Sequence, residues 1–356
     1  TSKTAGSYHP GNFDSAQVLN TDRFYYVAGW DEVETEKALC SVHLSARDRK
    51  IEASEKWLAP KYFEEYSNEE KHAKISEAIF KDYRKPEAGQ HFWADFYFEG
   101  GLNKIPMFTQ ISGEYLLRTK TDSRKLEVYT FVIDSDQSIV DFQSSVIEMD
   151  FSNKKLRERI EKSGLKVWHV LLGSTKPMQI RWVILDAQTG EIFTHSEALD
   201  VQETQMTMSN PFVPSNDMQW VVWPKPTDQI KHRGVLIQYP YNTKEGIFFP
   251  DLTPQFKTAD KDHIIYFKIY NLLPESNNPP VHFHLMDSKG NASAVSEFQL
   301  LRKPEMIEHQ GMELFWVVKS LPNVQPGDYR FRVDIQEPAG KGGITAETGP
   351  LQVSGS

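Results

Sequence analysis

Short segments in which apolar and polar residues alternate are the feature that most limits the fold of this chain. A period of two is typical of strands that bury one face, and turn residues such as those at 134–136 and 188–190 separate many of the segments. Many short strands with few helices between them predict β-sandwiches. The predicted strands cover residues 24–30, 38–46, 50–58, 92–98, 105–117, 126–133, 139–149, 166–172, 179–185, 192–199, 235–239, 247–249, 263–270, 280–286, 296–301, 313–319, 328–336 and 351–353.

Two helices are predicted from capping signals. Ser67 and Glu70 form a capping box in front of a helix near 68–80, and the acidic first turn suits the helix dipole. A second helix is expected at 153–163, because it ends at Gly164, a residue that often terminates helices.

The domain organisation follows from one break in the strand rhythm. Residues 202–227 are rich in proline and polar residues, and strands resume after them. We therefore predict a mainly β fold with two consecutive antiparallel β-sandwich domains of immunoglobulin-like type, the first with one or two short inserted helices. Residues 1–23 are expected to form an N-terminal extension, 24–204 the first domain and 205–356 the second.

Charge and composition exclude some classes of function. The chain has 356 residues, of which 40 are basic and 49 acidic, and its net charge of -9 argues against nucleic acid as a partner. No apolar run approaches the roughly 20 residues of a membrane-spanning helix. The single cysteine, Cys40, lies in a predicted strand and is expected to be a buried hydrophobe. Because the chain begins at Thr1 without methionine or a signal peptide, we expect a processed protein or a fragment.

Four aromatic residues near the predicted domain boundary are candidates for binding. Trp220, Trp223, Tyr239 and Tyr241 lie among several prolines, and together they predict a patch that stacks on carbohydrate or docks a protein. The alternative interpretation is that they pack in the interface between the two domains, and this alternative is favoured.

Two histidines are candidates for metal binding. His282 and His284 flank Phe283, so their imidazoles share one face of a strand, where His263 or Asp287 would complete a metal site. The alternative is a polar, solvent-facing side opposite a buried Phe283. No cofactor is predicted.

Sequence motifs for catalysis are missing. The chain contains no Gly-x-Ser-x-Gly, Cys-x-x-Cys or His-Glu-x-x-His pattern and no phosphate-binding glycine loop. We therefore expect that the protein is not an enzyme.

Several segments resemble one bacterial family. Residues 25–29, the Trp57-Leu58-Ala59-Pro60-Lys61 run, the helix start at 67–70 and the closing strand at 325–333 resemble the region after the type A domain in von Willebrand factor A-related (VWFA-related) proteins common in Acidobacteria. The resemblance implies an extracellular β-sandwich region. The type A domain itself is missing, so its metal-dependent adhesion site cannot be carried over.

One segment imitates that adhesion site. Residues 131–138 look like its strand and Asp-x-Ser-x-Ser loop, but position 136 is Asp where Ser is required, and a strand follows where a helix should. We expect a hairpin turn there.

These observations favour a non-enzymatic interaction or structural protein that is secreted, periplasmic or on the cell surface, such as an adhesion, scaffold or assembly subunit. Its expected partner is a protein or another envelope component. Two alternatives stay open. One is a carbohydrate-binding or carbohydrate-active protein that uses Trp220 and Trp223, and the other is an accessory subunit of a larger envelope complex that pairs through exposed edge strands.

Overall fold

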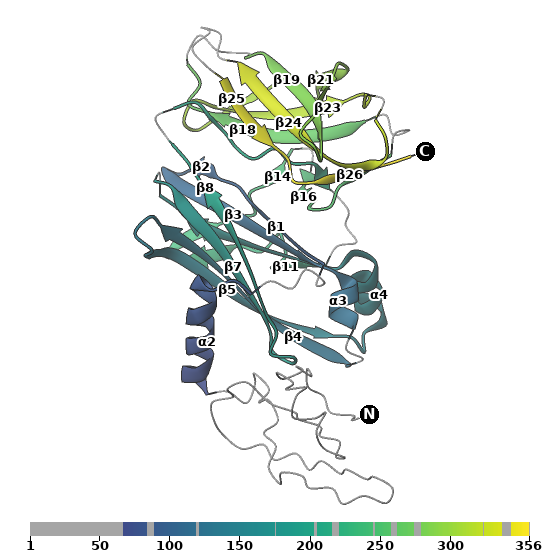
Figure 1. Ribbon diagram of the computed structural model, residues 1–356. Helices are drawn as coiled ribbons and strands as arrows, with labels where there is room; N and C mark the ends of the chain where they lie inside the picture. Colours follow the sequence, from purple (N-terminus) through teal and green to yellow (C-terminus); the bar gives the residue numbers. More distant parts are fainter. Residues whose placement is uncertain are drawn as a thin grey trace, which may run out of the picture. The chain divides into compact units, whose positions relative to one another are not determined.

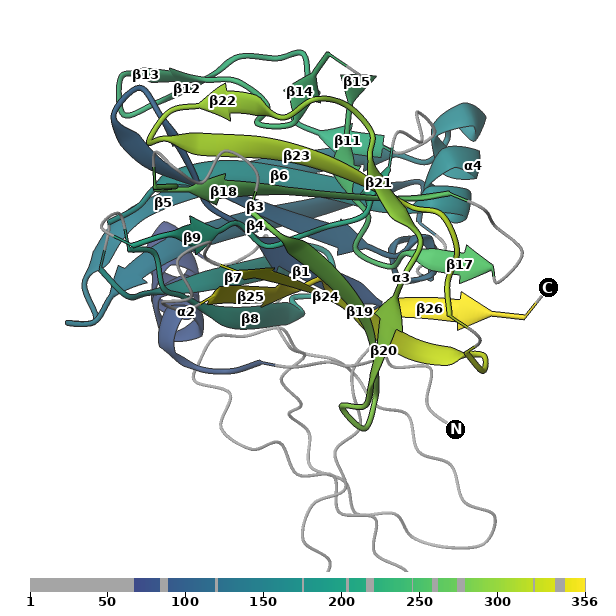
Figure 2. The ribbon, with the colours of Figure 1, turned by 90° about the horizontal axis from the view of Figure 1, so that it is seen from above.

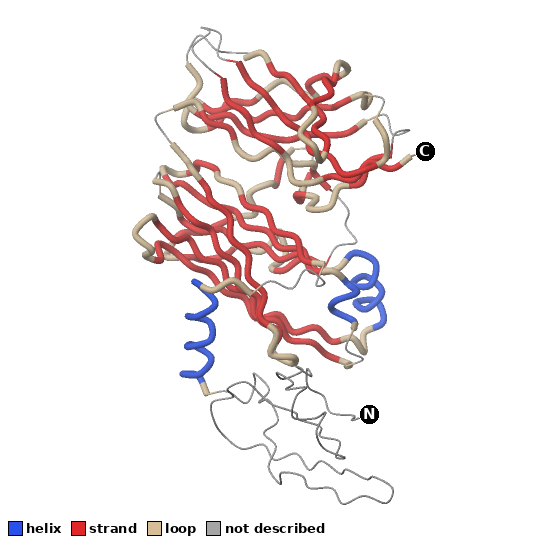
Figure 3. Tube along the Cα trace, in the orientation of Figure 1, coloured by secondary structure: helices blue, strands red, loops and turns tan. Residues whose placement is uncertain are grey.

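The computed structural model describes residues 67–83, 89–118, 121–174, 176–202, 205–215, 221–244, 246–257, 262–273, 279–322, 324–336 and 343–355. The chain divides into two units, 1–71 and 72–356, and all strands described below lie in the second. The fold is mainly β, with several sheets (Figure 3). Cys40 and the strands predicted at 24–30, 38–46 and 50–58 lie outside the described residues.

Two sheets face each other in the first part of this unit, and we call them the first sheet pair (Figure 1). One has the order β1-β3-β6-β11, with β2 also on β3: β1 (Gln90–Ala94), β2 (Tyr97–Glu99), β3 (Leu102–Ile111), β6 (Leu165–Leu172) and β11 (Val221–Trp223). The other has the order β5-β4-β7-β8: β4 (Ser123–Asp134), β5 (Ile139–Asp150), β7 (Met178–Asp186) and β8 (Ile192–Leu199). Buried side chains from both sheets form the core between them, among them Ile111, Leu165, Val128, Ile147 and Ile184.

Three helices of the described part of the chain flank this pair. Helix α2 (Asn68–Phe80) begins at the predicted capping box, where the Ser67 amide donates to the Glu70 carboxylate (2.5 Å) and the Glu70 amide donates to the Ser67 hydroxyl (3.2 Å). The last turn of α2 has no basic residue of its own. Arg181 of β7 supplies the cation instead and donates to the carbonyls of Ala78 and Lys81.

The other two helices lie together at one end of the pair (Figure 1). Helix α4 (Lys154–Ser163) starts at Asn153, whose side chain accepts from the Leu156 amide, and ends at Gly164 (φ 71°), as predicted. Helix α3 (Gly113–Leu117) corrects the strand predicted at 105–117. The strand ends at Ile111, and the Ser112 hydroxyl then caps a short helix by accepting from the Tyr115 amide.

A second pair of sheets follows, the second sheet pair. One sheet has the order β21-β23-β18-β9, with β22 also on β23: β9 (Thr207–Met208), β18 (His263–Tyr270), β21 (Phe298–Leu300), β22 (Glu305–Ile307) and β23 (Gly311–Val318). The other has the order β17-β26-β24-β19-β20, with β25 on β24: β17 (Gln255–Lys257), β19 (Val281–Asp287), β20 (Ala292–Val295), β24 (Gly327–Gln336), β25 (Gly343–Glu347) and β26 (Leu351–Ser354) (Figure 2). Its core includes Phe267, Leu285, Leu314, Phe331 and Val353.

The segment that connects the two pairs contributes to both. Strand β9 pairs with β18 of the second pair, and β11 then returns to β6 of the first pair before β17 joins the second. Three small two-stranded sheets complete the segment: β10 (Pro214–Ser215) with β16 (Phe249–Pro250), β12 (Ile230–His232) with β13 (Val235–Ile237), and β14 (Asn242–Thr243) with β15 (Gly246–Ile247).

Most predicted strands from residue 92 onwards are confirmed to within a few residues, and those at 192–199 and 263–270 match fully. The predicted strand at 92–98 is interrupted at Asp95 and Phe96. Two pairings are parallel, β6 with β11 and β17 with β26, because each short strand reaches its neighbour after a long connection. The loop at 134–138 is the predicted hairpin turn, in which the Asp134 carboxylate accepts from the amides of Asp136 and Ser138.

Candidate functional site

A group of ionisable side chains, all buried except the half-buried Glu313, lies where the connecting segment meets both sheet pairs. We call Asp95, Tyr241, Tyr266, Lys268 and Glu313 the junction cluster. Asp95 occupies the break between β1 and β2, Lys268 and Tyr266 lie on β18, and Glu313 lies on β23. Charged groups this well buried are uncommon in folds of this size, and they mark candidate sites.

Hydrogen bonds hold Asp95 in place. One carboxylate oxygen accepts from the Asn210 amide (2.9 Å) and the other from the Tyr241 hydroxyl (3.1 Å). The Asn210 side chain in turn donates to the Ala94 carbonyl (2.8 Å). Burial raises the pKa of Asp95 to about 7, although these donors act in the opposite direction.

Lys268 is the buried cation of the cluster. Its Nζ lies 5.1 Å from the ring centroid of Tyr97 and 5.9 Å from that of Tyr241. These ring faces stabilise the ammonium group, while burial lowers the pKa of Lys268. The charges of Glu313 and Asp95 partly restore the pKa.

Glu313 completes the cluster. It accepts from the Tyr266 hydroxyl (2.7 Å) and pairs with the Arg302 guanidinium (2.7 Å). Burial raises the pKa of Tyr266 above its ordinary range, and the Glu313 charge adds to that shift. Both phenols of the cluster therefore stay protonated near neutral pH and act as hydrogen-bond donors.

The four aromatic residues predicted to form a binding patch do not lie together on the surface. Tyr239 and Tyr241 are buried, and their hydroxyls donate to the Phe248 carbonyl (2.7 Å) and to Asp95. They pack in the core between the sheet pairs, which removes both from the predicted patch. Trp223 is 44% exposed on β11, and Trp220 lies outside the described residues.

The two predicted metal-ligating histidines lie on β19, with Phe283 buried between them. His284 faces Asp334 of β24 (Nε2 to Oδ2, 3.3 Å). The residues proposed to complete a metal site are used elsewhere, since His263 stacks against the Phe256 ring and Asp287 caps its own turn. Within the described ranges, no group of three or more His, Cys, Asp or Glu side chains is placed to hold a metal ion.

A second buried polar group lies between β4, β5 and β6. His169 of β6 bonds through Nδ1 to the Thr130 hydroxyl (2.9 Å) and through Nε2 to the Ser145 hydroxyl (2.8 Å). A serine next to a histidine resembles a nucleophile and its base, but burial lowers the pKa of His169 to about 3. Such an imidazole is a poor proton acceptor, so this arrangement favours a structural hydrogen-bond chain.

Asp141 of β5 links that group to the connecting segment. Its carboxylate contacts His232 Nε2 (2.7 Å) and Arg233 Nε (2.7 Å) and accepts from the Leu172 amide (2.7 Å). The β12–β13 hairpin, which carries His232 and Arg233, is thereby fastened to the first sheet pair.

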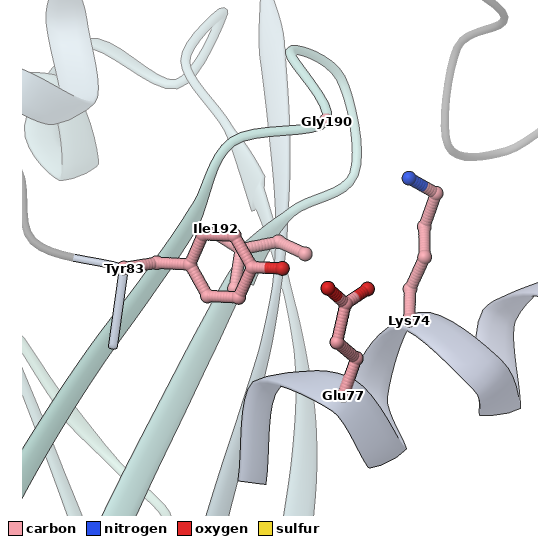
Figure 4. A pocket seen from close by; sticks show the side chains of 5 residues that line it. All are labelled: Lys74, Glu77, Tyr83, Gly190 and Ile192. Carbon is pink, nitrogen blue, oxygen red and sulfur yellow. The ribbon is translucent and has the colours of Figure 1, made fainter. Parts of the chain in front are cut away.

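A shallow pocket of about 190 Å³ lies beside α2 and is lined by Lys74, Glu77, Tyr83, Gly190 and Ile192 (Figure 4). It is smaller than the roughly 300–1,000 Å³ typical of ligand sites. A hydrogen bond from Lys81 lowers the pKa of Glu77, which keeps the pocket's carboxylate charged.

Sequence reasoning missed the junction cluster and His169. A usable signal was present, since Asp95, Lys268 and His169 each interrupt an otherwise apolar strand segment. The pairing of these residues depends on strands far apart in the sequence and has no local signature.

Comparison with known proteins gives little further information. No protein-family model matches the sequence, and no curated protein matches it. Three solved structures share limited likeness: neutral ceramidase from Pseudomonas aeruginosa (15% identity, TM-score 0.22, covering 29% of this chain and 18% of that chain), a family 123 glycoside hydrolase from Clostridium perfringens (9%, 0.20, 29% and 22%) and red sea bream transglutaminase (8%, 0.21, 76% and 32%). The chain thus spans a third or less of each of these proteins. All three TM-scores are below 0.5, so the likenesses indicate neither a shared fold nor a function.

Proposed function

We propose that this chain is a non-enzymatic interaction or structural protein of the extracellular space or cell envelope, built from two β-sandwich modules of immunoglobulin-like type. The two sheet pairs, each with its own core, support the two modules. Among the described residues no helix has the length and apolar character needed to cross a membrane.

The use of the buried charged side chains carries this proposal. Asp95 holds the connecting segment through Asn210 and Tyr241, and Asp141 holds the hairpin through His232 and Arg233. In both places the polar side chains that could serve catalysis instead make hydrogen bonds and ion pairs that join segments of the fold. A fold whose segments are joined by such buried contacts suits a protein that presents its surface to binding partners.

Localisation and partner capture test the proposal. The tagged full-length protein, cross-linked in cells of the source organism, is expected in the protease-accessible fraction and in a stoichiometric adduct with an envelope component. A cytoplasmic protein without adducts would contradict it. So would turnover of an ester, amide or glycoside that is lost in Asp95→Asn or His169→Gln.

We further propose kinship with the region after the type A domain of VWFA-related proteins. The capping box at the start of α2 and the closing strand β24 support this proposal. The reading frame upstream of Thr1 tests this kinship, because it is expected to encode a signal peptide and a type A domain.

A carbohydrate-binding role is the second candidate, and the exposed indole of Trp223 favours it. Binding on a glycan array that disappears in Trp223→Ala but persists in Leu236→Ala, a matched change at another exposed apolar residue, would support it. Equal binding by both variants would contradict it.

A further inference from the structure

Strand β5 presents a long free edge. It is the outermost strand of its sheet and pairs along one side with β4, through a register that is regular from Ser123–Asp150 to Val132–Asp141 and shifts at Val140 before Ile133–Ile139. No described residue pairs with its other side. An edge of this length is a template for another strand, and natural proteins usually protect it with prolines, bulges or charges. The bulge of β5 lies at Val140, and between Phe142 and Ile147 this edge carries neither proline, bulge nor charge.

The orientation of the backbone groups at this edge follows from one contact. The Phe142 amide donates to the carboxylate of its own neighbour, Asp141 (2.9 Å), and that carboxylate also binds Arg233 and the Leu172 amide, which lie outside the sheet of β4. In an antiparallel ladder the N–H and C=O of alternate residues point to the same side. The amides and carbonyls of Phe142, Ser144 and Val146 therefore point towards the free edge, where the Phe142 amide is already bonded to Asp141.

The exposed side chains of the same residues form a symmetric pattern. Phe142 is 53% exposed and Val146 is 51% exposed, and they flank the exposed Ser144 at equal spacing. Phe142 also stacks on Phe131 at 6.1 Å, so the apolar surface continues onto β4. Asp141, which lies on the opposite face, is buried and contacts His232 and Arg233.

We propose that two copies of this chain pair antiparallel through β5, about a two-fold axis at Ser144. Ser144 then lies opposite Ser144 of the second copy, and each Phe142 lies opposite a Val146. Two pairs of exposed apolar side chains then contact each other across the interface. Because the register shift is an even number of residues, the exposed side chains of both copies lie on the same face of the combined sheet. The interface is self-complementary, as a two-fold interface must be.

Charge placement favours a second copy over an unrelated strand. In this register the two Glu148 carboxylates are eight residues apart along the strand, about 26 Å at roughly 3.3 Å per residue. No like charges oppose each other. The pairing goes beyond the proposed function, since an enzyme or a carbohydrate-binding protein would use it equally.

Site-specific disulfide formation tests the register. In a Cys40→Ser background, Ser144→Cys places two thiols on opposite residues of a hydrogen-bonded pair, with Cα atoms about 5.5 Å apart, which is within the disulfide range of about 4.4–6.8 Å. Mild oxidation is expected to convert most of the full chain to a covalent dimer on a non-reducing gel. Glu148→Cys is the matched control on the same strand and is expected to form no covalent dimer on the same gel. A monomeric Ser144→Cys, or equal cross-linking at both positions, overturns the proposal.

Sedimentation equilibrium provides the second measurement. The unmodified chain is expected to dimerise with rising concentration. Val146→Lys is expected to weaken the dimer about tenfold, because two cross-strand apolar pairs are lost. Met306→Lys, a change at a 63% exposed residue on β22, is expected to leave it unchanged. A wild-type chain that remains monomeric at every concentration overturns the proposal. If Val146→Lys fails to fold, the disulfide test with Ser144→Cys still decides the proposal.

Discussion

The charge of Asp95 links the junction cluster to pH. Burial raises the pKa of its carboxyl from the ordinary 3.8 to about 7 in the folded state. Between about pH 4 and 7 the folded chain therefore keeps a proton that the unfolded chain has lost, and the free energy of unfolding falls as the pH rises through this window. Above pH 7 the loss is complete.

Asp95→Asn is expected to remove this pH dependence. Relative to the wild type, its free energy of unfolding should rise between pH 4 and pH 8 by at most about 4 kcal/mol, at about 1.36 kcal/mol for each pKa unit. Urea denaturation at several pH values measures the difference, with Asp136→Asn in an exposed turn as the control. Parallel profiles of wild type and Asp95→Asn would contradict the burial of a titrating group.

His169 is expected to change the free energy of unfolding with pH in the opposite direction. Burial lowers its pKa from the ordinary 6.5 to about 3, so on acidification the unfolded chain binds a proton before the folded chain does. The free energy of unfolding therefore falls as the pH drops from about 6.5 towards 3. His169→Gln should lose less stability over this range, measured by thermal unfolding at pH 4 and 7. The exposed His282→Gln should behave as the wild type does, and an identical loss in all three proteins would refute the assignment.

At the scale of the element, the close approach of the end of α4 to the end of β3 depends on glycine. Gly164 ends α4 at φ 71°, and a Cβ there would lie 2.3 Å from the Ile111 carbonyl oxygen. Gly190 has nearly the same φ, 69°, but a Cβ there meets nothing within 4 Å. The two glycines therefore separate backbone strain from steric crowding.

Gly164→Ala is expected to destabilise the protein by more than Gly190→Ala. The left-handed conformation alone costs roughly 1–2 kcal/mol for a non-glycine residue, and the clash at 164 adds to it. Chemical denaturation of both variants provides the measurement. Equal losses would mean that α4 shifts without cost to relieve the clash.

Elements with local signals were predictable. Helices α2 and α4 start and end where capping residues such as Ser67, Asn153 and Gly164 place them, because caps act within one turn. Helix α3 was not predictable, since the alternation of β3 runs into it and its packing depends on Ile160 of a helix distant in sequence. The parallel pairing of β11 with β6 likewise depends on tertiary structure.

At the scale of the whole molecule, aromatic residues alone do not reveal whether they are buried. Tyr241 and Trp223 both lie near the predicted boundary, and one is in the core while the other is exposed. The difference arises because Tyr241 reaches Asp95, which is far away in the sequence. The sequence predicted that these aromatic residues lie either in a domain interface or in an exposed binding patch. Only the fold shows which of the two applies to each residue.

One hydrophobic cluster runs from the first sheet pair into the second, which makes cooperative unfolding of both pairs the expected behaviour. Phe212 lies at its centre, with ring centroids 5.2 Å from Trp93 of β1, 4.9 Å from Tyr241 and 5.0 Å from Tyr266 of β18. Phe212→Ala is expected to cost about 3–5 kcal/mol and to split a single calorimetric transition into two.

Phe283→Ala is the matched control, because Phe283 is equally buried but belongs to the core of the second sheet pair. It should lower the transition temperature while the junction stays intact, so that unfolding remains a single transition. Two transitions in the wild type, or one transition in Phe212→Ala, would mean that contacts other than this aromatic cluster set the coupling between the sheet pairs. If Phe212→Ala alone splits the transition, the aromatic cluster, and not the strands that cross between the pairs, makes the two pairs unfold as one body.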